Sequence, residues 1–311
     1  EAQQTYFAVL RIIFTVSMIS DIVSLIFLIK HTPHNQKTWR NYMLFIQVML
    51  IVNDLHTELL LQPVPLFPAP AGFTTGLLCS LGMPAEVQAG IGGLLLATVG
   101  SSIVLCVFHR HQTILMNRSR FRFGKGAYWT IHIGLLATNA FPPTLFACTT
   151  VDPKINYDRL KNDNHNLTWL VDRGCYFYIQ LQNVTIILAL SLVLLTIFNS
   201  TCALTFMFIH MNYVLKRDNH GRSLQSINNI RRSIRRLFAQ ICAPAAVIFI
   251  SIIINELASF EQCLTLFTLM LFHPIVHNVS LILTTPSYRA TLKRAFGIKT
   301  PVNVNVVERN R

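Results

Sequence analysis

Seven stretches of the chain are almost continuously apolar, and each is long enough to cross a lipid bilayer. A bilayer's hydrocarbon core requires about 20 apolar residues in a helix. The stretches that meet this length cover residues 7–29, 42–66, 84–108, 127–147, 179–211, 237–260 and 263–285. Hydrophobic residues make up 52% of the chain and charged residues only 13%, which is typical of helices surrounded by lipid. The pattern predicts an all-α fold, a bundle of seven transmembrane helices that forms a single domain over residues 1–311, with a tail at 286–311.

The basic residues predict the orientation of these helices, because lysine and arginine are retained on the cytoplasmic side of a membrane. Three of them follow the first span, five the third, seven the fifth and six the seventh, which is 21 of the 26 in the chain. We therefore expect a multi-pass plasma-membrane protein with its amino terminus outside and its tail inside. The net charge of +13 follows from this topology and indicates contact with anionic lipid, not with nucleic acid.

Small residues recur every four positions along the third span, at Ala89, Gly93, Ala97 and Ser101. Such a stripe lets neighbouring helix backbones approach closely, which favours packing in a membrane. The third span is therefore predicted to be the central helix of the bundle.

Four cysteines, Cys79, Cys148, Cys175 and Cys263, are expected at or near the outer surface, where oxidising conditions permit disulfides. A bond between Cys79 and Cys175 would hold the long loop between the fourth and fifth spans over the mouth of the bundle. Four cysteines allow three full pairings, and the sequence does not choose among them. The same loop contains Asn166-Leu-Thr, an N-glycosylation acceptor on the side expected to be external.

Polar residues cluster inside the spans, where they are energetically costly. The second span contains Asp54, His56 and Glu58, and the seventh contains His273 and His277, four residues apart and so on one helical face. Such groups either satisfy one another between helices or serve a function. Two kinds of protein would explain a functional role: a receptor whose polar network changes state on ligand binding, and an intramembrane zinc hydrolase that uses His273 and His277 as ligands.

The hydrolase alternative is the weaker of the two. Pro274 lies between the two histidines and disturbs their register, and the interior of the third span offers no Asp or His. A transporter or channel is a further alternative, but neither paired short, broken spans nor an internal repeat is visible. We therefore expect no enzyme, no catalytic residue, no metal and no cofactor.

The sixth span is predicted to extend into the cytoplasm as a basic amphipathic helix. Apolar residues recur at intervals of three and four over residues 224–241, and four arginines lie beside them: Arg231, Arg232, Arg235 and Arg236. After the seventh span, Thr285 can cap and Pro286 can start a short cytoplasmic helix. Both helices are suited either to docking a partner or to binding lipid headgroups.

Three stretches resemble the signatures of nematode serpentine chemoreceptors. They are the run from Asn53 to Gly72 followed by Gly76-Leu-Leu, the run from Phe108 to Ile114 at the base of the third span, and Thr285-Pro-Ser-Tyr-Arg289 after the seventh span. The chain is most similar to class I, with class H as the near relative, and the resemblance covers nearly the whole sequence. It implies a G-protein-coupled receptor for environmental or internal chemical cues, displayed on the cilia of sensory neurons.

The chain departs from the broader rhodopsin-like pattern at two motifs. His109-Arg110-His111 stands where that class has an acidic residue, Arg and Tyr, so the acid that would restrain Arg110 is absent. His273-Pro-Ile-Val-His277 stands where Asn-Pro-x-x-Tyr is usual, which keeps the proline kink and alters the polar partner. The activation switches of that class therefore do not carry over residue by residue.

A receptor of this kind predicts three groups of functional residues. A small external molecule would enter among spans two, three, five, six and seven, and the candidates for binding it are Glu58, Gln62, Glu86, Gln88, Gln182, Asn255 and Glu256. The candidates for a polar switch between two packings are Asp54, His56, His273, His277 and Asn278. Outward movement of the inner end of span six would open a cleft for a heterotrimeric G protein, and the candidate contacts are Arg110, Arg231, Arg232 and Arg235.

Overall fold

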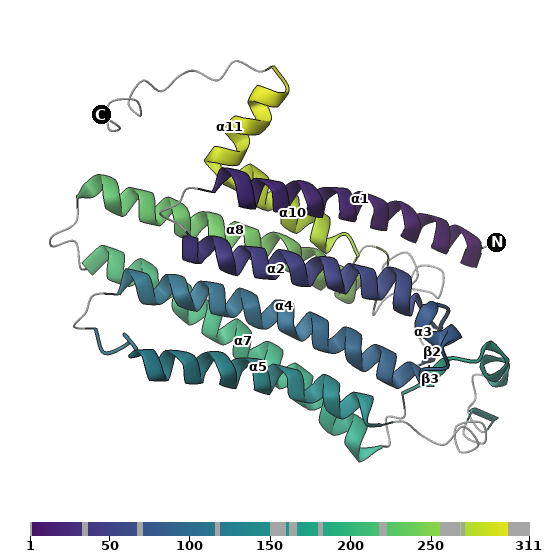
Figure 1. Ribbon diagram of the computed structural model, residues 1–311. Coiled ribbons are helices and arrows are strands. Elements are labelled where there is room, and N and C mark those ends of the chain that lie inside the picture. Colours follow the sequence, from purple (N-terminus) through teal and green to yellow (C-terminus); the bar gives the residue numbers. More distant parts are fainter. Residues whose placement is uncertain are drawn as a thin grey trace.

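The structure is a bundle of long helices that run roughly parallel and antiparallel to one another (Figure 1). This computed structural model describes residues 2–32, 37–66, 71–115, 119–149, 160–161, 167–179, 183–217, 223–255, 268 and 271–297. The helices that match the seven predicted spans are α1 (Ala2–His31), α2 (Lys37–Leu55) with its π-helical continuation η2 (His56–Leu61), α4 (Ala85–Ile114), α5 (Lys125–Ala147), α7 (Val184–Arg217), α8 (Leu224–Asn255) and α10 (His273–Thr284). The predicted all-α class is confirmed.

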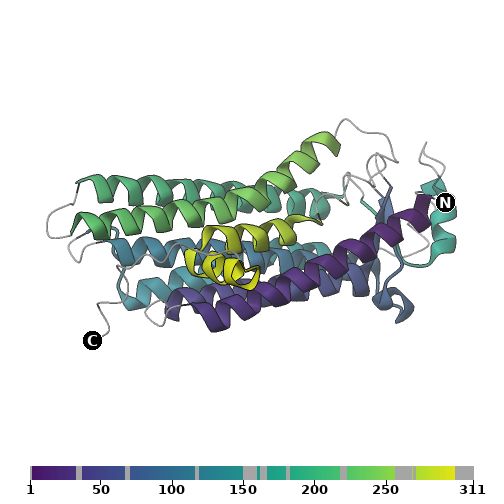
Figure 2. The ribbon, with the colours of Figure 1, turned by 90° about the horizontal axis from the view of Figure 1, so that it is seen from above.

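The two ends of the bundle differ (Figures 1 and 2). One end, which we call the sheet end, holds the start of α1 and three antiparallel strands, β1 (Pro63–Pro65), β2 (Ala71–Thr74) and β3 (Tyr176–Tyr178). The opposite end, which we call the basic end, holds the last turns of α4 and α7 and the first turns of α5 and α8, with the arginines of α8 beside them. The short helix α11 (Pro286–Ala295) turns away from α10 and contacts α1. The predicted short helix after the seventh span is therefore present, although Thr285 makes no capping hydrogen bond with its side chain.

The small sheet was not predicted from the sequence. The second helix ends at Leu61, short of the predicted residue 66, because Pro63 and Pro65 have no N–H groups with which to continue it. Gln62 adopts the left-handed conformation, with φ 43° and ψ 67°, and thereby turns the chain into β1. In the centre of the sheet, a Cβ atom at Gly72 would lie 2.5 Å from the ring of Phe177, so only glycine fits there.

A disulfide joins Cys79 to Cys175, with their Cα atoms 5.7 Å apart. It links the short helix α3 (Leu77–Ser80), which precedes α4, to the residue before β3. This is one of the pairings that the sequence left open. Cys148 is an exposed free thiol, and Cys263 lies outside the described residues.

An apolar cluster packs the sheet against the start of α1. Tyr6 and Leu10 of α1 contact residues of the strands and of η3 (Thr168–Arg173), including Val64, Phe73 and Leu170. The hydroxyl of Tyr6 also donates a hydrogen bond to the Pro63 carbonyl oxygen at 2.9 Å. The start of α1, the strands and η3 therefore pack together and close this end of the bundle.

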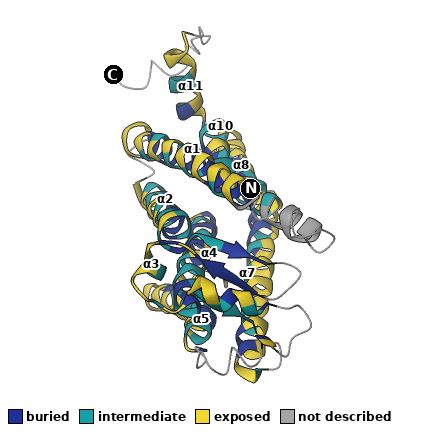
Figure 3. Ribbon diagram, turned by 90° about the vertical axis from the view of Figure 1, so that its right-hand side faces the viewer, coloured by how far each residue is buried: buried dark blue, intermediate teal, exposed yellow. Residues whose placement is uncertain are grey.

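Large apolar side chains are exposed along the helices, whereas polar side chains are buried among apolar ones in the interior, unlike in a water-soluble bundle. Figure 3 shows which stretches of the helices are buried and which are exposed. The exposed face of α1 is made of Ile12, Val16, Ile19, Ile22, Ile26 and Ile29. The opposite face buries Ser17, Asp21 and Ser24. An apolar surface of this extent requires a cover such as lipid. By length and composition, four of the described helical segments can cross a membrane: Gln4–His31, Lys37–Leu61, Ala85–Ile114 and Val184–Arg217.

Helix α4 packs against α2, α5 and α7, in agreement with the central place predicted for the third span. Its small residues allow the close approach of α5, because a Cβ atom at Gly90 would lie 2.5 Å from the Cβ of Ala147 and one at Gly93 would lie 3.0 Å from the Cβ of Pro143. Farther along the same interface, Asn139 donates a hydrogen bond to the Ser101 hydroxyl at 2.7 Å. The predicted close packing along this stripe is confirmed at Gly93.

Candidate functional site

A buried hydrogen-bond network connects α1, α2 and α10. The Asp21 carboxylate on α1 accepts hydrogen bonds from Gln47 Nε2 at 2.7 Å and from Asn278 Nδ2 at 2.6 Å. Asn278 also donates to the Ser20 hydroxyl at 2.9 Å. The side chains of Asp21, Gln47 and Asn278 are fully buried. Because buried polar groups are costly when unpaired, this network fixes the relative positions of three helices.

The predicted switch residues Asp54 and Asn278 are both bonded to α1. Asp54 is buried and accepts a hydrogen bond from the Ser17 hydroxyl at 2.6 Å, one turn away from the contacts of Asn278. The predicted switch residues did not include any residue of α1, although α1 contributes to this network. Its signal was present in the sequence, since Ser17, Asp21 and Ser24 recur at helical spacing within an otherwise apolar span.

The three predicted switch histidines lie apart from this network. His56 in η2 is 2% exposed, and neither ring nitrogen has a hydrogen-bond partner among the residues that the structure describes. Its ring lies against Gly92 of α4, where a Cβ atom would be 3.2 Å away. His273 is half-buried at the first position of α10, and His277 is buried one turn later. Across the described ranges, no three His, Cys, Asp or Glu residues are grouped so that they could hold a metal ion.

The candidate ligand-binding residues that the structure describes lie at the ends of η2, α4 and α8 that are nearest the sheet end. Glu58 and Glu86 are half-buried, and Gln88 is fully buried with its Nε2 donating to the Met83 carbonyl oxygen at 2.7 Å. Gln62, which follows η2, donates from its Nε2 to the Glu58 carbonyl oxygen within that helix at 3.1 Å. Asn255 is the last residue of α8. Gln182 and Glu256 lie outside the described residues, as does the predicted glycosylation site Asn166.

Several buried polar atoms at this end have no hydrogen-bond partner in the described part of the chain. They are both ring nitrogens of His56, Oε1 of Gln88, Oγ1 of Thr74 and the hydroxyl oxygen of Tyr176. Burial, and then the charge of the nearby Glu86, raise the pKa of Tyr176, so its hydroxyl remains a neutral donor. Unsatisfied polar groups of this kind can bind a polar ligand or water.

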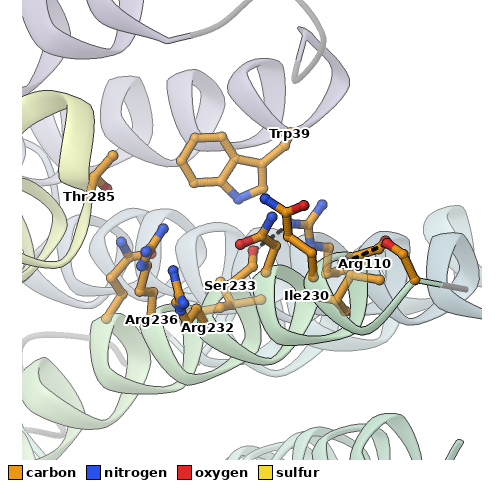
Figure 4. Close-up of a pocket in the computed structure, with 13 residues that line it drawn as sticks. Trp39, Arg110, Ile230, Arg232, Ser233, Arg236 and Thr285 are labelled. Carbon is orange, nitrogen blue, oxygen red and sulfur yellow. Dashed lines mark hydrogen bonds between the residues drawn. The ribbon is translucent and has the colours of Figure 1, made fainter. Parts of the chain in front are cut away.

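A cavity of about 570 Å³ lies at the basic end, among α2, α4 and α8 (Figure 4). Its lining consists of Trp39, Arg110, Ser223, Gln225, Ser226, Asn229, Ile230, Arg232, Ser233, Arg236, Leu237, Gln240 and Thr285. Two of the predicted partner contacts, Arg110 and Arg232, are therefore brought together here. Arg231 and Arg235 are not among the lining residues, whereas Arg236, which was not among the candidates, is.

Arg110 joins α4 to α8 across this cavity, because its Nη2 donates a hydrogen bond to the Ser233 hydroxyl (Figure 4). Gln240 of α8 in turn donates to the Thr284 hydroxyl of α10 at 2.8 Å. Sequence reasoning missed Ser233, since the rhodopsin-like pattern directs attention to an acid beside the arginine. Here a neutral serine from another helix is the partner of Arg110.

Two further hydrogen-bonded clusters fix the other helices at the basic end. The hydroxyl of Tyr42 on α2 bonds to the Tyr128 hydroxyl at 2.7 Å and to His132 Nε2 at 2.9 Å, both on α5. His111 Nε2 on α4 bonds to His210 Nδ1 on α7 at 2.8 Å. These contacts join α2 to α5 and α4 to α7, without any direct involvement of α8.

Buried polar networks inside a bundle of long helices with an apolar surface are typical of a multi-pass transmembrane protein, in which such residues mark function. Over residues 2–292 the chain matches the family described as serpentine type 7TM GPCR chemoreceptor Sri, and it belongs to that family. The resemblance to serpentine chemoreceptors is thereby confirmed. A comparison with curated proteins gives no match.

Proposed function

We propose that the protein is a chemosensory receptor that binds a small external molecule near its sheet end and activates a heterotrimeric G protein through the cavity at its basic end. The observation that carries this proposal is the Arg110–Ser233 hydrogen bond beside that cavity. It joins α4 to α8 at the place where movement of α8 would widen the cavity. A signal then consists of a change in the balance between two packings.

The groups nearest the sheet end are the proposed binding region. Glu58, Glu86 and Gln88 lie there with the unpartnered nitrogens of His56, and Gln62, Gln182, Asn255 and Glu256 are proposed to complete it. A ligand that bonds to these groups would favour the packing in which they are satisfied.

The polar residues between the two ends are proposed to transmit the change. Asp54 and Asn278 connect α2 and α10 to α1, so a shift of either helix alters the packing of the other. His56, His273 and His277 are proposed to exchange partners in the same transition. Arg110, Arg231, Arg232 and Arg235 are then proposed contacts for the G protein.

The Ser233→Ala variant tests the link at the basic end. It removes the acceptor for Arg110, so α8 is released from α4 and basal G-protein activation should rise, by about 5-fold for a loss of roughly 1 kcal/mol from the resting packing. The measurement is G-protein activation in a heterologous cell line, normalised to receptor at the cell surface. Ser226→Ala is the matched control, because Ser226 lines the same cavity but is not the residue whose hydroxyl accepts the hydrogen bond from Arg110. Equal basal activity in the two variants would contradict the proposed role.

In the proposed topology, the amino terminus and Asn166 lie on the outer side of the plasma membrane and the tail lies on the cytoplasmic side. The membrane is proposed to be that of a sensory cilium. An epitope placed before residue 1 should be stained on intact cells, and one placed after residue 311 only after permeabilisation. Asn166→Gln should abolish any shift in mobility that a glycosidase produces. The opposite staining would reject the receptor orientation.

A further inference from the structure

The cavity at the basic end contains concentrated positive charge. Arg110 comes from α4, and Arg232 and Arg236 come from α8, where they lie four residues apart on one helical face (Figure 4). Among the lining residues that the structure describes there is no Asp or Glu. Like charges at this spacing repel each other. Burial, together with the charges of Arg289 and Arg232, lowers the pKa of Arg236, as expected for a cation that lacks a compensating anion.

The remaining lining groups are also suited to an anion. Trp39 offers an indole N–H, and Gln225 and Asn229 offer amide donors. Ser223, which precedes α8, and Ser226 in its first turn also line the cavity, and the positive end of a helix dipole favours negative charge. Arg110 uses one of its five N–H donors for Ser233, so it retains donors for a ligand.

The arginines and the size of the cavity indicate the class of anion. Guanidinium groups bind phosphate through two parallel hydrogen bonds, which lysine cannot do. A volume of about 570 Å³ falls in the range of roughly 300–1,000 Å³ that is usual for small-molecule sites, so there is room for several phosphate groups on one scaffold.

We propose that this cavity binds a multiply phosphorylated anion of the inositol phosphate class, either free or as the headgroup of a membrane phosphoinositide. Arg232 and Arg236 hold one phosphate group between them, and Arg110 contacts a second. This site is distinct from the proposed site for the external ligand. Binding of the anion requires no G protein, so it can be tested on the receptor alone.

The first experiment uses the purified full-length receptor in bilayer nanodiscs of phosphatidylcholine, titrated with inositol 1,4,5-trisphosphate in a calorimeter. The R232Q/R236Q double variant should lose affinity about 10-fold or more, because each removes a charge-assisted hydrogen bond. The matched control is R120Q/R294Q, which removes two arginines that are exposed outside the cavity. The control should bind as the wild type does. Equal losses in the two double variants would overturn the proposal, as would absence of binding by the wild type together with failure of the lipid measurement described below.

A second variant guards against misfolding. Asn229→Asp keeps the size of a lining side chain and adds a negative charge to the cavity, so it should also weaken binding without lowering the thermal unfolding midpoint, since the new carboxylate offsets part of the repulsion between the arginines. Inorganic phosphate alone should bind far more weakly than the trisphosphate. If phosphate bound equally well, the assignment to a multiply phosphorylated anion would be wrong.

The two sources of the anion are separated by a third measurement. Nanodiscs that contain phosphatidylinositol 4,5-bisphosphate should raise the unfolding temperature of the wild type but not of R232Q/R236Q if the headgroup reaches the cavity. Stabilisation by this lipid without binding of the soluble trisphosphate would assign the site to the membrane lipid. Binding of the soluble anion without stabilisation by the lipid would assign it to the free form. Failure of both would overturn the site itself.

Discussion

Replacing Gly90 by alanine should force α4 and α5 apart. A Cβ atom at Gly90 would lie 2.5 Å from the Cβ of Ala147 and 3.0 Å from the carbonyl oxygen of Pro143. Carbon atoms in contact are normally about 3.5–4.0 Å apart, so the new methyl group overlaps that of Ala147 by about 1 Å or more. Neither methyl group can rotate away, because each is attached directly to a helix backbone. The helices themselves must therefore move.

The expected cost follows from two opposing effects. Overpacking of this kind typically costs about 1–3 kcal/mol, whereas alanine in place of glycine favours a helix by roughly 0.5–1 kcal/mol. We expect a net loss of about 1–2 kcal/mol for Gly90→Ala. Gly100→Ala on the same helix is the control, because nothing lies within 4 Å of its added Cβ. That variant should be as stable as the wild type or slightly more stable.

The assay is the midpoint of thermal unfolding of the purified receptor in one detergent. Gly90→Ala should lower it by a few degrees relative to Gly100→Ala. Adding Ala147→Gly to Gly90→Ala removes the opposing methyl group and should restore part of the loss, since the shortest contact is lost and the contacts of 3.0 Å with the Pro143 carbonyl oxygen and 3.1 Å with the Cα of residue 147 remain. Equal midpoints for the two glycine variants, or strictly additive losses in the double variant, would refute this account of the α4–α5 contact.

Three other predictions concern covalent and polar links in the bundle. Cys79→Ser and Cys175→Ser should each cost about 2–5 kcal/mol and reduce surface expression, and the double variant should be no worse than either; additive losses would argue against their bond. Asn278→Leu removes two donors from the buried network and leaves Asp21 less satisfied, so thermal stability should fall by about 1–3 kcal/mol; an unchanged midpoint would contradict the network. Tyr288→Phe keeps the buried ring but removes the 2.6 Å hydrogen bond between α11 and the residue that follows α1, and it should cost about 1 kcal/mol, seen as faster amide exchange in α11 alone.

The helices could be predicted from the sequence because membrane insertion depends on a local property, the length of an apolar run. The inward extension of the sixth span was predicted from another local property, the recurrence of apolar residues at intervals of three and four, and α8 does begin at Leu224. The sheet was missed because its strands are only three or four residues long, and because β2 pairs with β3 across more than 100 residues of chain. Pro63 and Pro65 indicated that the helix ends before residue 66, but the apolar residues continue to that position, and the span was therefore predicted to be too long.

The site could be predicted only in part. Basic residues identified the correct end of the bundle, yet the cavity is formed by side chains from separate elements, such as Trp39, Arg110 and Ser233. Which of several neighbouring arginines faces the cavity depends on the rotation of α8, and this is set by packing and not by composition. Arg236 faces it, whereas Arg235 is exposed elsewhere. The roles of the candidate ligand and switch residues remain predictions.

The bond between Asp21 and Asn278 has a consequence for biosynthesis, because the two residues lie 257 positions apart in the chain. A ribosome adds about 5–20 residues per second, so Asn278 is made roughly 13–50 s after Asp21. Gln47, only 26 positions later, is available to the carboxylate much sooner. The isolated α1 can still enter the membrane. Its aspartate raises the free energy of insertion by about 2.5–3.5 kcal/mol at most, whereas each of the many Ile, Leu, Val and Phe residues of the helix lowers it by about 0.3–0.6 kcal/mol. The insertion of α10 therefore completes the hydrogen bonds of Asp21. A nascent chain that ends before α10 retains an Asp21 carboxylate without its Asn278 partner inside the bilayer, which cellular quality control can detect.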